Sequence, residues 1–198
     1  SRLAQTVKTS TEAFERYEYA DALDATNQFF WADFCDNYLE LIKKRVYNED
    51  GSATPAAQQS AVRTLYYVLD GILKLYAPFT PHVTEELYSH IFETVYTERG
   101  SLHARGMWPL QSHYAVDETA LELGAQALTV LGLIRTEKSS TNRSIKFPID
   151  ILRISPTRDA EKWMNDVSGA GNVRAWETSA SLPEDKIEVI FATEADAA

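Results

Sequence analysis

The spacing of apolar residues predicts helices over the first two thirds of the chain. Residues 2–17 form the first predicted helix, and the segment from Asp21 to Tyr47, which has neither Gly nor Pro, forms a second and longer one. Inside the longer segment two adjacent stripes recur at spacings of three and four: Trp31, Cys35, Tyr38, Ile42 and Val46 on one, and Leu23, Asn27, Phe30 and Phe34 on the other. So wide a face predicts a central helix that packs against more than one neighbour, with Trp31, Cys35 and Tyr38 in the core.

Further helices follow. Turn formers at residues 48–55 precede one that ends at Ala77, because the next residue is proline, which disfavours helix in the residue before it. Thr80 and Pro81 suit a helix N-cap and a first helical residue, so another helix begins there. The last helix is predicted over residues 117–137. Short connections between the middle helices favour an antiparallel bundle of five helices.

After residue 144 the pattern changes to short strands around one short helix. Alternation from Ile145 to Ile151 predicts a strand, residues 160–167 a helix, and residues 173–178 and 187–192 two more strands. The predicted fold class is therefore mainly α, an antiparallel helical bundle with a small C-terminal α/β subdomain of β-α-β-β order. The expected domains are the bundle (1–143), the α/β subdomain (144–193) and an acidic tail (194–198).

The net charge of −10 narrows the possible functions. Phosphate binding needs clustered cations, so a chain this acidic does not grip nucleic acid over its whole surface and would have to bind it locally. Two basic clusters are candidates: Lys43, Lys44 and Arg45 form one, and Arg135, Lys138, Arg143 and Lys146 form the other. The default interpretation of either cluster alone is a solvated helix face.

Motifs that carry chemistry are missing. Cys35 is the lone cysteine, which excludes an internal disulfide and a thiolate metal cluster. His82 and His90 do not have the i, i+4 spacing of a ligand pair on adjacent helical turns. Without a G-x-x-x-x-G-K-[ST], G-x-G-x-x-G or G-x-S-x-G segment, the sequence predicts no catalytic residue, no metal and no cofactor. It has no signal peptide and no membrane-length apolar stretch, and so predicts a cytoplasmic protein.

Two segments resemble a known family. Residues 29–40, FFWADFCDNYLE, are similar to the F-x-W-x-x-F-C-D-x-Y-[IL]-E helix of the anticodon-binding domain in valyl-tRNA synthetases. Residues 73–88, LKLYAPFTPHVTEELY, resemble the L-x-x-L-x-x-P-[FI]-x-P-x-x-[TA]-E-E-[LI]-[WY] helix junction that valyl, leucyl and isoleucyl enzymes share. Residues 34–36, FCD, favour the valyl form. Residues 134–139, IRTEKS, extend the match across roughly residues 3–140.

This resemblance implies a class I synthetase anticodon-binding fold and a tRNA partner, with valine tRNA as the expected one and with neither DNA nor a membrane as a partner. The H-I-G-H and K-M-S-K-S signatures of the catalytic domain are missing. The chain alone, an excised fragment or a free-standing homologue, is therefore expected to be non-catalytic. ATP and Mg²⁺ would act in the catalytic domain of the parent valine-tRNA ligase. That domain and the editing domain are the other expected partners.

The resemblance places anticodon contacts near the start of the long helix. Unpaired bases stack on aromatic or guanidinium planes, while nearby cations bind the backbone. The residues expected to bind tRNA are Arg16, Asn27, Phe30 and Phe34 near the anticodon, and Lys43, Lys44, Arg135 and Lys138 on phosphates. Phe34 suits the core as well as a stacking platform, whereas Arg16 and Lys138 are expected at the surface.

Two alternatives remain open. An isoleucyl or leucyl enzyme would keep the mechanism and change the tRNA. A helical protein-interaction domain derived from the same fold would agree with the acidic charge. Exposed apolar surface without a basic groove would favour the interaction domain, and a basic groove beside Phe30 or Phe34 would favour RNA.

Overall fold

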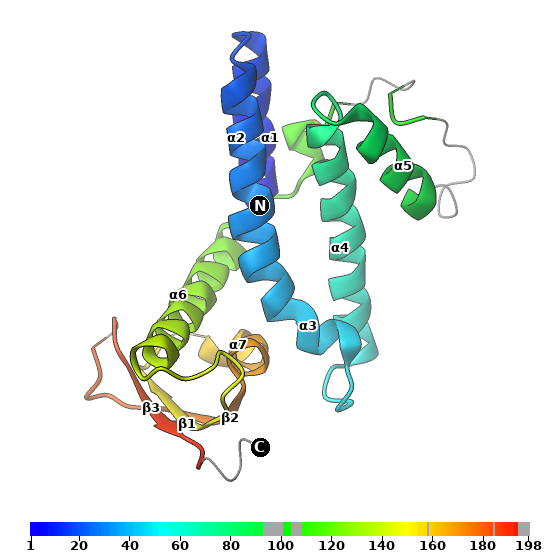
Figure 1. Ribbon diagram of the computed structural model, residues 1–198. Coiled ribbons are helices and arrows are strands. Elements are labelled where there is room, and N and C mark those ends of the chain that lie inside the picture. The colour runs from blue at the N-terminus through cyan, green and yellow to red at the C-terminus, as the bar shows by residue number, and fades with distance from the viewer. Residues whose placement is uncertain (93–100, 104–107, 158, 184, 194–198) are drawn as a thin grey trace. The chain divides into compact units, whose positions relative to one another are not determined.

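The computed structural model describes residues 1–92, 101–103, 108–157, 159–183 and 185–193. Its contacts divide the chain into two compact units, which we call the helical unit (residues 1–38 and 59–117) and the mixed unit (residues 39–58 and 118–198). The fold class is confirmed as mainly helical with one small sheet (Figure 1). The domain boundary expected at residue 143 stays a prediction, and the expected tail over 194–198 lies outside the described residues.

The helical unit begins with a hairpin of two helices. α1 (Arg2–Glu15) and α2 (Tyr19–Gln28) lie side by side (Figure 1). Ser10 is buried between them, and its hydroxyl donates to the Ala22 carbonyl at 3.3 Å. Trp108, much later in the chain, is tied to the hairpin because its indole Nε1 donates to the hydroxyl of Thr11 at 2.7 Å.

The turn between α1 and α2 holds a tyrosine in a backbone conformation that suits glycine or asparagine. Tyr17 has a φ of 62°. Its amide donates to the Phe14 carbonyl at 3.0 Å, and the amide of Glu18 donates to the Ala13 carbonyl at 2.9 Å. These two bonds form a Schellman helix end with Tyr17 at its left-handed position. A bulky residue in this conformation destabilises the fold by on the order of 1 kcal/mol. Because Tyr17 is 78% exposed, packing of its side chain does not offset that cost.

The centre of the long predicted helix is wound more loosely than expected. Residues Phe29–Leu39 (η1), directly after α2, form a π-helical segment, whose hydrogen bonds join residues five apart. Phe30, Phe34 and Tyr38 follow one another in a row, with successive ring centroids 6.5 and 6.1 Å apart. Trp31 is 61% exposed. The expectation that it lies in the core is therefore wrong, because the wider turn changes which residues share a face.

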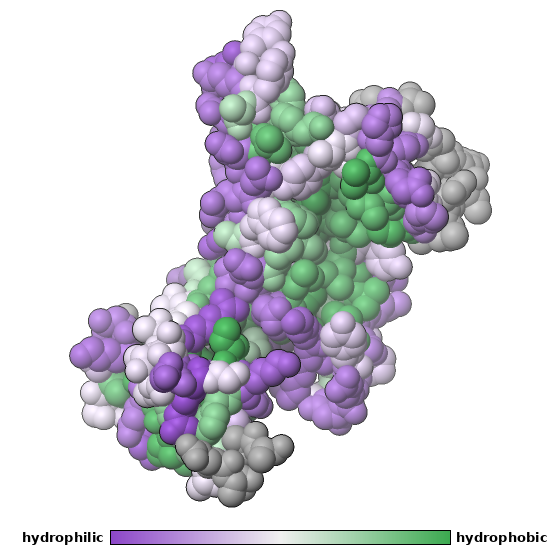
Figure 2. All heavy atoms as spheres, in the orientation of Figure 1, coloured by the Kyte–Doolittle hydropathy of each residue, from purple (hydrophilic) through white to green (hydrophobic). Residues whose placement is uncertain are grey.

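A corner marked by proline joins the next two helices, as predicted. α4 (Pro55–Tyr76) stops before Ala77, and α5 (Pro81–Phe92) begins at the expected proline. The two helices pack through a cluster of Leu73, Tyr88, Phe92 and Leu102. Apolar residues also gather over α4 and α5 on the face that Figure 2 shows. The large exposed apolar side chains of these helices are Tyr66, Tyr67, Val83 and Leu87.

The mixed unit is built on a small sheet of order β2-β1-β3, in which β1 is parallel to β2 and antiparallel to β3. The expected β-α-β-β order is confirmed, since α7 connects β1 to β2. The bounds are α6, Glu118–Ser140; β1, Ile149–Ile154; α7, Met164–Gly171; β2, Val173–Thr178; and β3, Ile187–Phe191. Short 3₁₀ turns lie at Gln111–His113 (η2, in the helical unit) and Ala160–Lys162 (η3).

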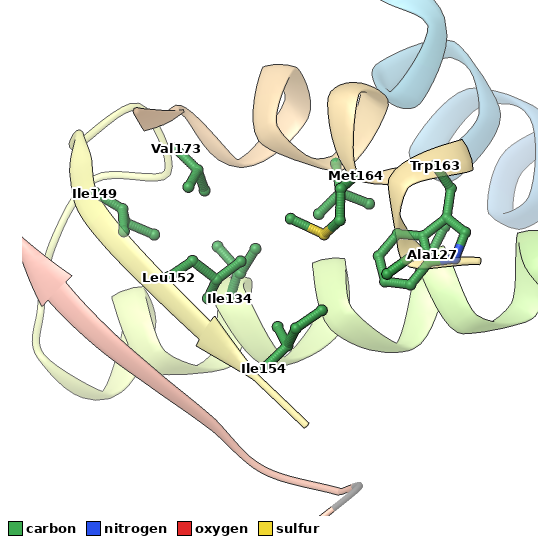
Figure 3. Close-up of a cluster of buried hydrophobic side chains, with 10 residues drawn as sticks. Ala127, Ile134, Ile149, Leu152, Ile154, Trp163, Met164 and Val173 are labelled. Carbon is green, nitrogen blue, oxygen red and sulfur yellow. The ribbon is translucent and has the colours of Figure 1, made fainter. Parts of the chain in front are cut away.

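The core of the mixed unit lies between the sheet and its helices (Figure 3). Ile134 reaches it from α6, Leu152 from β1 and Met164 from α7, and each is at most 1% exposed. On β1, Arg153 instead pairs with Glu188 of β3 at 3.0 Å and with Glu177 of β2. The predicted alternation from Ile145 to Ile151 is confirmed only in part: β1 begins at Ile149, its register shifts between Ile149 and Ile151, and the buried residues beyond the shift are Leu152 and Ile154.

α3 (Glu40–Tyr47) packs closely against α7. A methyl group at Gly169 would lie 2.9 Å from the Lys44 Cβ, so glycine is what allows this approach. Arg45 and Asp166 lie 2.9 Å apart across the contact. Burial raises the pKa of Asp166, and the nearby Arg45 opposes that shift.

One cation of the mixed unit is fully enclosed. Lys138 is 1% exposed, and its Nζ donates to the carbonyls of Ile145 and Gly171, each at 2.7 Å. It therefore ties α6 to the loop before β1 and to the end of α7. Burial lowers the pKa of Lys138 from its ordinary value of 10.5 to about 8. The neutral amine keeps two N–H donors, so both bonds survive deprotonation.

This burial makes the stability of the mixed unit depend on pH in the alkaline range. Between pH 8 and 10.5 the unfolded chain binds the Lys138 proton more tightly than the folded chain, so the contribution of this group to stability rises with pH. We expect the free energy of unfolding, relative to that of Lys138→Met, to increase by about 2 kcal/mol from about pH 7.5 to about pH 9.5. Urea unfolding at the two pH values measures it.

The control for this measurement is Lys162→Met, because Lys162 is an exposed lysine whose ammonium lies 3.1 Å from the carboxylate of Asp159. Its comparison with the unaltered chain should show no such increase. A difference between the unaltered chain and Lys138→Met that stays constant with pH would contradict the prediction.

Candidate functional site

The four residues expected near the anticodon do not form one cluster. Arg16 lies in the turn between α1 and α2, whereas Asn27 is near the end of α2 and Phe30 and Phe34 belong to η1. The length of α2 therefore separates Arg16 from the other three residues (Figure 1).

Arg16 is exposed, as expected, and shares its turn with aromatic rings. Its guanidinium pairs with Glu18 at 2.7 Å, and both side chains are about half exposed. Such a surface pair contributes little stability and opens readily. Tyr17 and Tyr19, which are 78% and 51% exposed, meet edge to face with ring centroids 6.3 Å apart. We call residues 16–19 the tyrosine turn, which offers the aromatic planes and the cation that unpaired RNA requires.

Asn27 and Phe30 are half-buried and engaged with α4. The hydroxyl of Tyr76 donates to Asn27 Oδ1 at 2.7 Å. The Tyr76 ring also meets the Phe30 ring edge to face at 5.7 Å. Burial raises the pKa of Tyr76, so this hydroxyl remains a donor at neutral pH. These contacts position Asn27 and Phe30 within the helical unit.

Phe34 belongs to the core of the helical unit. It is 8% exposed, and its ring lies between those of Phe30 and Tyr38. A stacking platform needs a ring face open to solvent. Of the two interpretations that the sequence allows for Phe34, the structure favours the core. The nearby Trp31 has the exposed ring instead, 4.8 Å from that of Phe30.

The two lysines predicted on α3 differ in how firmly they are held. Lys43 is exposed and pairs with Glu40 on the same helix at 2.5 Å, which leaves it able to exchange that partner for a phosphate. Lys44 packs its stem against Gly169, and its Nζ lies 3.3 Å from both Asp50 and Asn165. Hydrogen bonds from Ser52 and the charge of Lys44 lower the pKa of Asp50 to about 2.

The two cations predicted on α6 are less open than the sequence suggests. Arg135 is half-buried. The expectation that Lys138 lies at the surface is wrong, because its ammonium is enclosed and bonded to the carbonyls of Ile145 and Gly171. Lys138 lies two residues before the end of α6 and follows the periodicity of that helix into the core, which a count of charges does not take into account.

Other kinds of site are not found among the described residues. No three His, Cys, Asp or Glu side chains converge as metal ligands would. None of the described helices has the length and apolar composition needed to cross a membrane. Burial and the nearby Asp36 raise the pKa of Cys35, so its thiol is a poor nucleophile at neutral pH.

Sequence reasoning missed three exposed rings in the segment from α1 to η1, namely those of Tyr17, Tyr19 and Trp31. A signal for the first two was present. Residues 16–19 read RYEY at the point where one predicted helix gives way to the next, whereas such turns normally carry Gly or Asn. Trp31 had no usable signal, because α-helical periodicity assigned it to the core.

Comparison with known proteins gives a consistent result. A family model described as the anticodon-binding domain of tRNA ligase matches residues 1–153. A protein named Valine--tRNA ligase from Rickettsia akari (strain Hartford) is 36% identical over 193 residues, covering 96% of this chain and 23% of the relative. Proteins of the same name from Orientia tsutsugamushi (strain Boryong) and Rickettsia felis (strain ATCC VR-1525 / URRWXCal2) are 39% and 41% identical over 81% and 78% of this chain. The chain spans about a fifth of the length of these relatives.

Burial predicts opposite effects of removing Phe34 and Trp31. We expect Phe34→Ala to lower the free energy of unfolding by about 3–5 kcal/mol, because it leaves a cavity between Phe30 and Tyr38. Trp31→Ala should change it by less than about 1 kcal/mol, since the ring is mostly exposed. Urea unfolding of both variants tests this, and a stable Phe34→Ala chain would show that Phe34 is not a core residue.

Proposed function

Because the chain belongs to the family of anticodon-binding domains of tRNA ligases, we propose that it binds the anticodon stem and loop of valine tRNA. Binding there would position the tRNA for aminoacylation by the catalytic domain of a parent valine-tRNA ligase. The observation that carries the proposal is the similarity to relatives named Valine--tRNA ligase across 96% of this chain. An isoleucyl or leucyl parent is the alternative, since part of the sequence pattern is shared with those enzymes.

The tyrosine turn is the part of the helical unit that best fits an unpaired base. Tyr17 and Tyr19 are exposed aromatic side chains, and Arg16 adds a guanidinium beside them. Tyr17 keeps its ring at the surface in spite of an unfavourable φ. Strain that packing does not require is typical of positions selected for contact with a ligand.

The remaining predicted residues are assigned by their charge, their exposure and their contacts within the protein. We propose Lys43 and Arg135 as phosphate contacts and Trp31 as a second aromatic contact. Asn27 and Phe30 act through their contacts with Tyr76, which fix the helix that carries them. Lys44, held by α7, and Lys138, held in the core, maintain the mixed unit.

The chain itself is proposed to be non-catalytic and to act in the cytoplasm, with ATP and Mg²⁺ used by the catalytic domain of the parent enzyme. We propose the catalytic and editing domains as further partners. The exposed apolar side chains of α4 and α5 support a protein contact on the helical unit. The same exposed apolar side chains are the observation that favours the alternative function, a protein-interaction domain.

Titration with tRNA tests the function. Transcripts of valine, leucine and isoleucine tRNA, together with a valine tRNA of altered anticodon, should be added to the chain at low and moderate salt. We expect the valine transcript to bind most tightly and the altered anticodon to abolish that preference. Equal binding of all transcripts would contradict anticodon reading, and no binding at low salt would favour an interaction domain.

Replacing Tyr17 separates folding from binding. Tyr17→Asn puts a residue that tolerates positive φ at position 17, so stability should rise by about 1 kcal/mol. Loss of the ring should weaken tRNA binding by about 1–3 kcal/mol. Thermal unfolding and tRNA titration measure the two effects.

The matched control is Tyr47→Asn, which removes a tyrosine of similar exposure (69%) from the end of α3. It should change tRNA affinity little and should not raise stability. If Tyr17→Asn binds tRNA as tightly as the unaltered chain, the tyrosine turn is not the base platform.

A further inference from the structure

Most cations of this acidic chain are already neutralised. At least ten described lysine and arginine side chains lie within ion-pair distance of a carboxylate. Arg143 and Lys146, in the loop between α6 and β1, have no carboxylate partner among the residues that the structure describes. Arg63 and Lys186 share this property, but each stands alone in the sequence. Within the described part of the chain, the α6–β1 loop (residues 141–148) is therefore the segment in which positive charge without a carboxylate partner is concentrated.

The fold sets the position of Arg143 through the end of α6. Asn142 has a φ of 56°, and its amide donates to the Ser139 carbonyl at 3.0 Å. The Arg143 amide donates to the Lys138 carbonyl at 2.8 Å. These bonds form a Schellman motif with asparagine, a residue suited to the left-handed position. Arg143 is thus the first residue after a well-defined helix end.

Two hydrogen bonds from buried or neighbouring side chains fix the backbone of the rest of the α6–β1 loop. The enclosed Lys138 ammonium holds the Ile145 carbonyl at 2.7 Å, and the Asn172 side-chain amide holds the Lys146 carbonyl at 2.6 Å. The backbone of the loop is therefore fixed at two successive residues, while the Lys146 side chain is at the surface. A cation on a fixed backbone loses less conformational freedom on binding than one on a mobile loop.

Two phenyl rings orient the Arg143 guanidinium. Its central carbon lies 4.3 Å from the centroid of the Phe147 ring and 4.4 Å from that of the Phe191 ring. The two rings meet edge to face with centroids 6.0 Å apart. A cation–π contact does not use a hydrogen-bond acceptor, so N–H donors of the guanidinium remain for one. No acceptor among the described residues takes them, and the acceptor geometry that suits such a fork is a phosphate.

We propose that Arg143 and Lys146 form a binding site for backbone phosphates of the tRNA. The hydrogen bond from Lys138 to the Ile145 carbonyl fixes the loop that carries the two cations. The site rests on the proposed tRNA-binding function and adds to Lys43 and Arg135 a further contact in the mixed unit that reads no base. It explains how a chain of net charge −10 holds RNA locally. Because phosphates are the same in every sequence, this site contributes affinity and salt dependence but no anticodon preference.

The test is the salt dependence of tRNA binding by Arg143→Gln/Lys146→Gln. Valine tRNA and its altered-anticodon form should be titrated at several salt concentrations with the double variant and with the unaltered chain. We expect the slope of log affinity against log salt to become shallower by about one to two in the double variant. Both tRNAs should lose affinity by the same factor, so that the preference between them is unchanged.

The control variant is Arg63→Gln/Lys186→Gln, which makes the same change of net charge at two separate cations that have no carboxylate partner among the described residues. It should keep the slope of the unaltered chain within about half a unit. Lys146→Gln alone removes no ring contact, and it should make the slope shallower by about one even if loss of Arg143 disturbs the packing of Phe147 and Phe191.

The outcomes separate this proposal from the function on which it rests. One outcome is that the unaltered chain binds tRNA while the double variant Arg143→Gln/Lys146→Gln and the single variant Lys146→Gln both keep the salt slope of the control. The phosphate site is then wrong, and the proposed function stands. If both tRNAs lose affinity but the anticodon preference also changes, Arg143 or Lys146 reads a base and the proposal is overturned. If the unaltered chain binds no tRNA, the proposed function and the phosphate site both fall.

Discussion

The mixed unit depends on one buried cation. Lys138 reaches inward from α6 and joins two carbonyls, those of Ile145 and Gly171, that come from segments distant in the sequence. An apolar side chain at this position would leave both carbonyls without a donor inside the protein, which is among the costlier defects of a core. These two bonds link α6 to the loop before β1 and to the end of α7. The bond to Ile145 also helps to fix the loop that carries Arg143 and Lys146.

The elements of the fold were largely predictable because they follow from local rules. Proline after Ala77 and Pro81 at a helix start marked the α4–α5 corner, and alternation near the C-terminus predicted the strands. These local rules did not predict a change in helical winding. α-Helical periodicity took no account of the π-helical winding of Phe29–Leu39, and so it assigned Trp31 to the core.

The candidate site was predictable only at the level of regions. The resemblance pointed to the helices that carry Arg16 and Phe34, but which side chains face solvent depends on packing that no motif encodes. Lys138 shows the limit most clearly, because the residue type predicts a surface position and the buried carbonyls around it require the opposite. Arg143 shows the reverse, since its half-buried charge is positioned by the rings of Phe147 and of Phe191, a residue of β3 that pairs with the first residue of β1.

The backbone at Tyr17 also bears on how this sequence evolves. Folding alone favours glycine or asparagine at a left-handed helix end, so random substitution would steadily replace an aromatic residue there. A lineage that keeps an aromatic ring at position 17 does so against that drift. Related chains that no longer need the tyrosine turn should therefore carry glycine or asparagine at position 17, and the turn between α1 and α2 should be free of backbone strain in them.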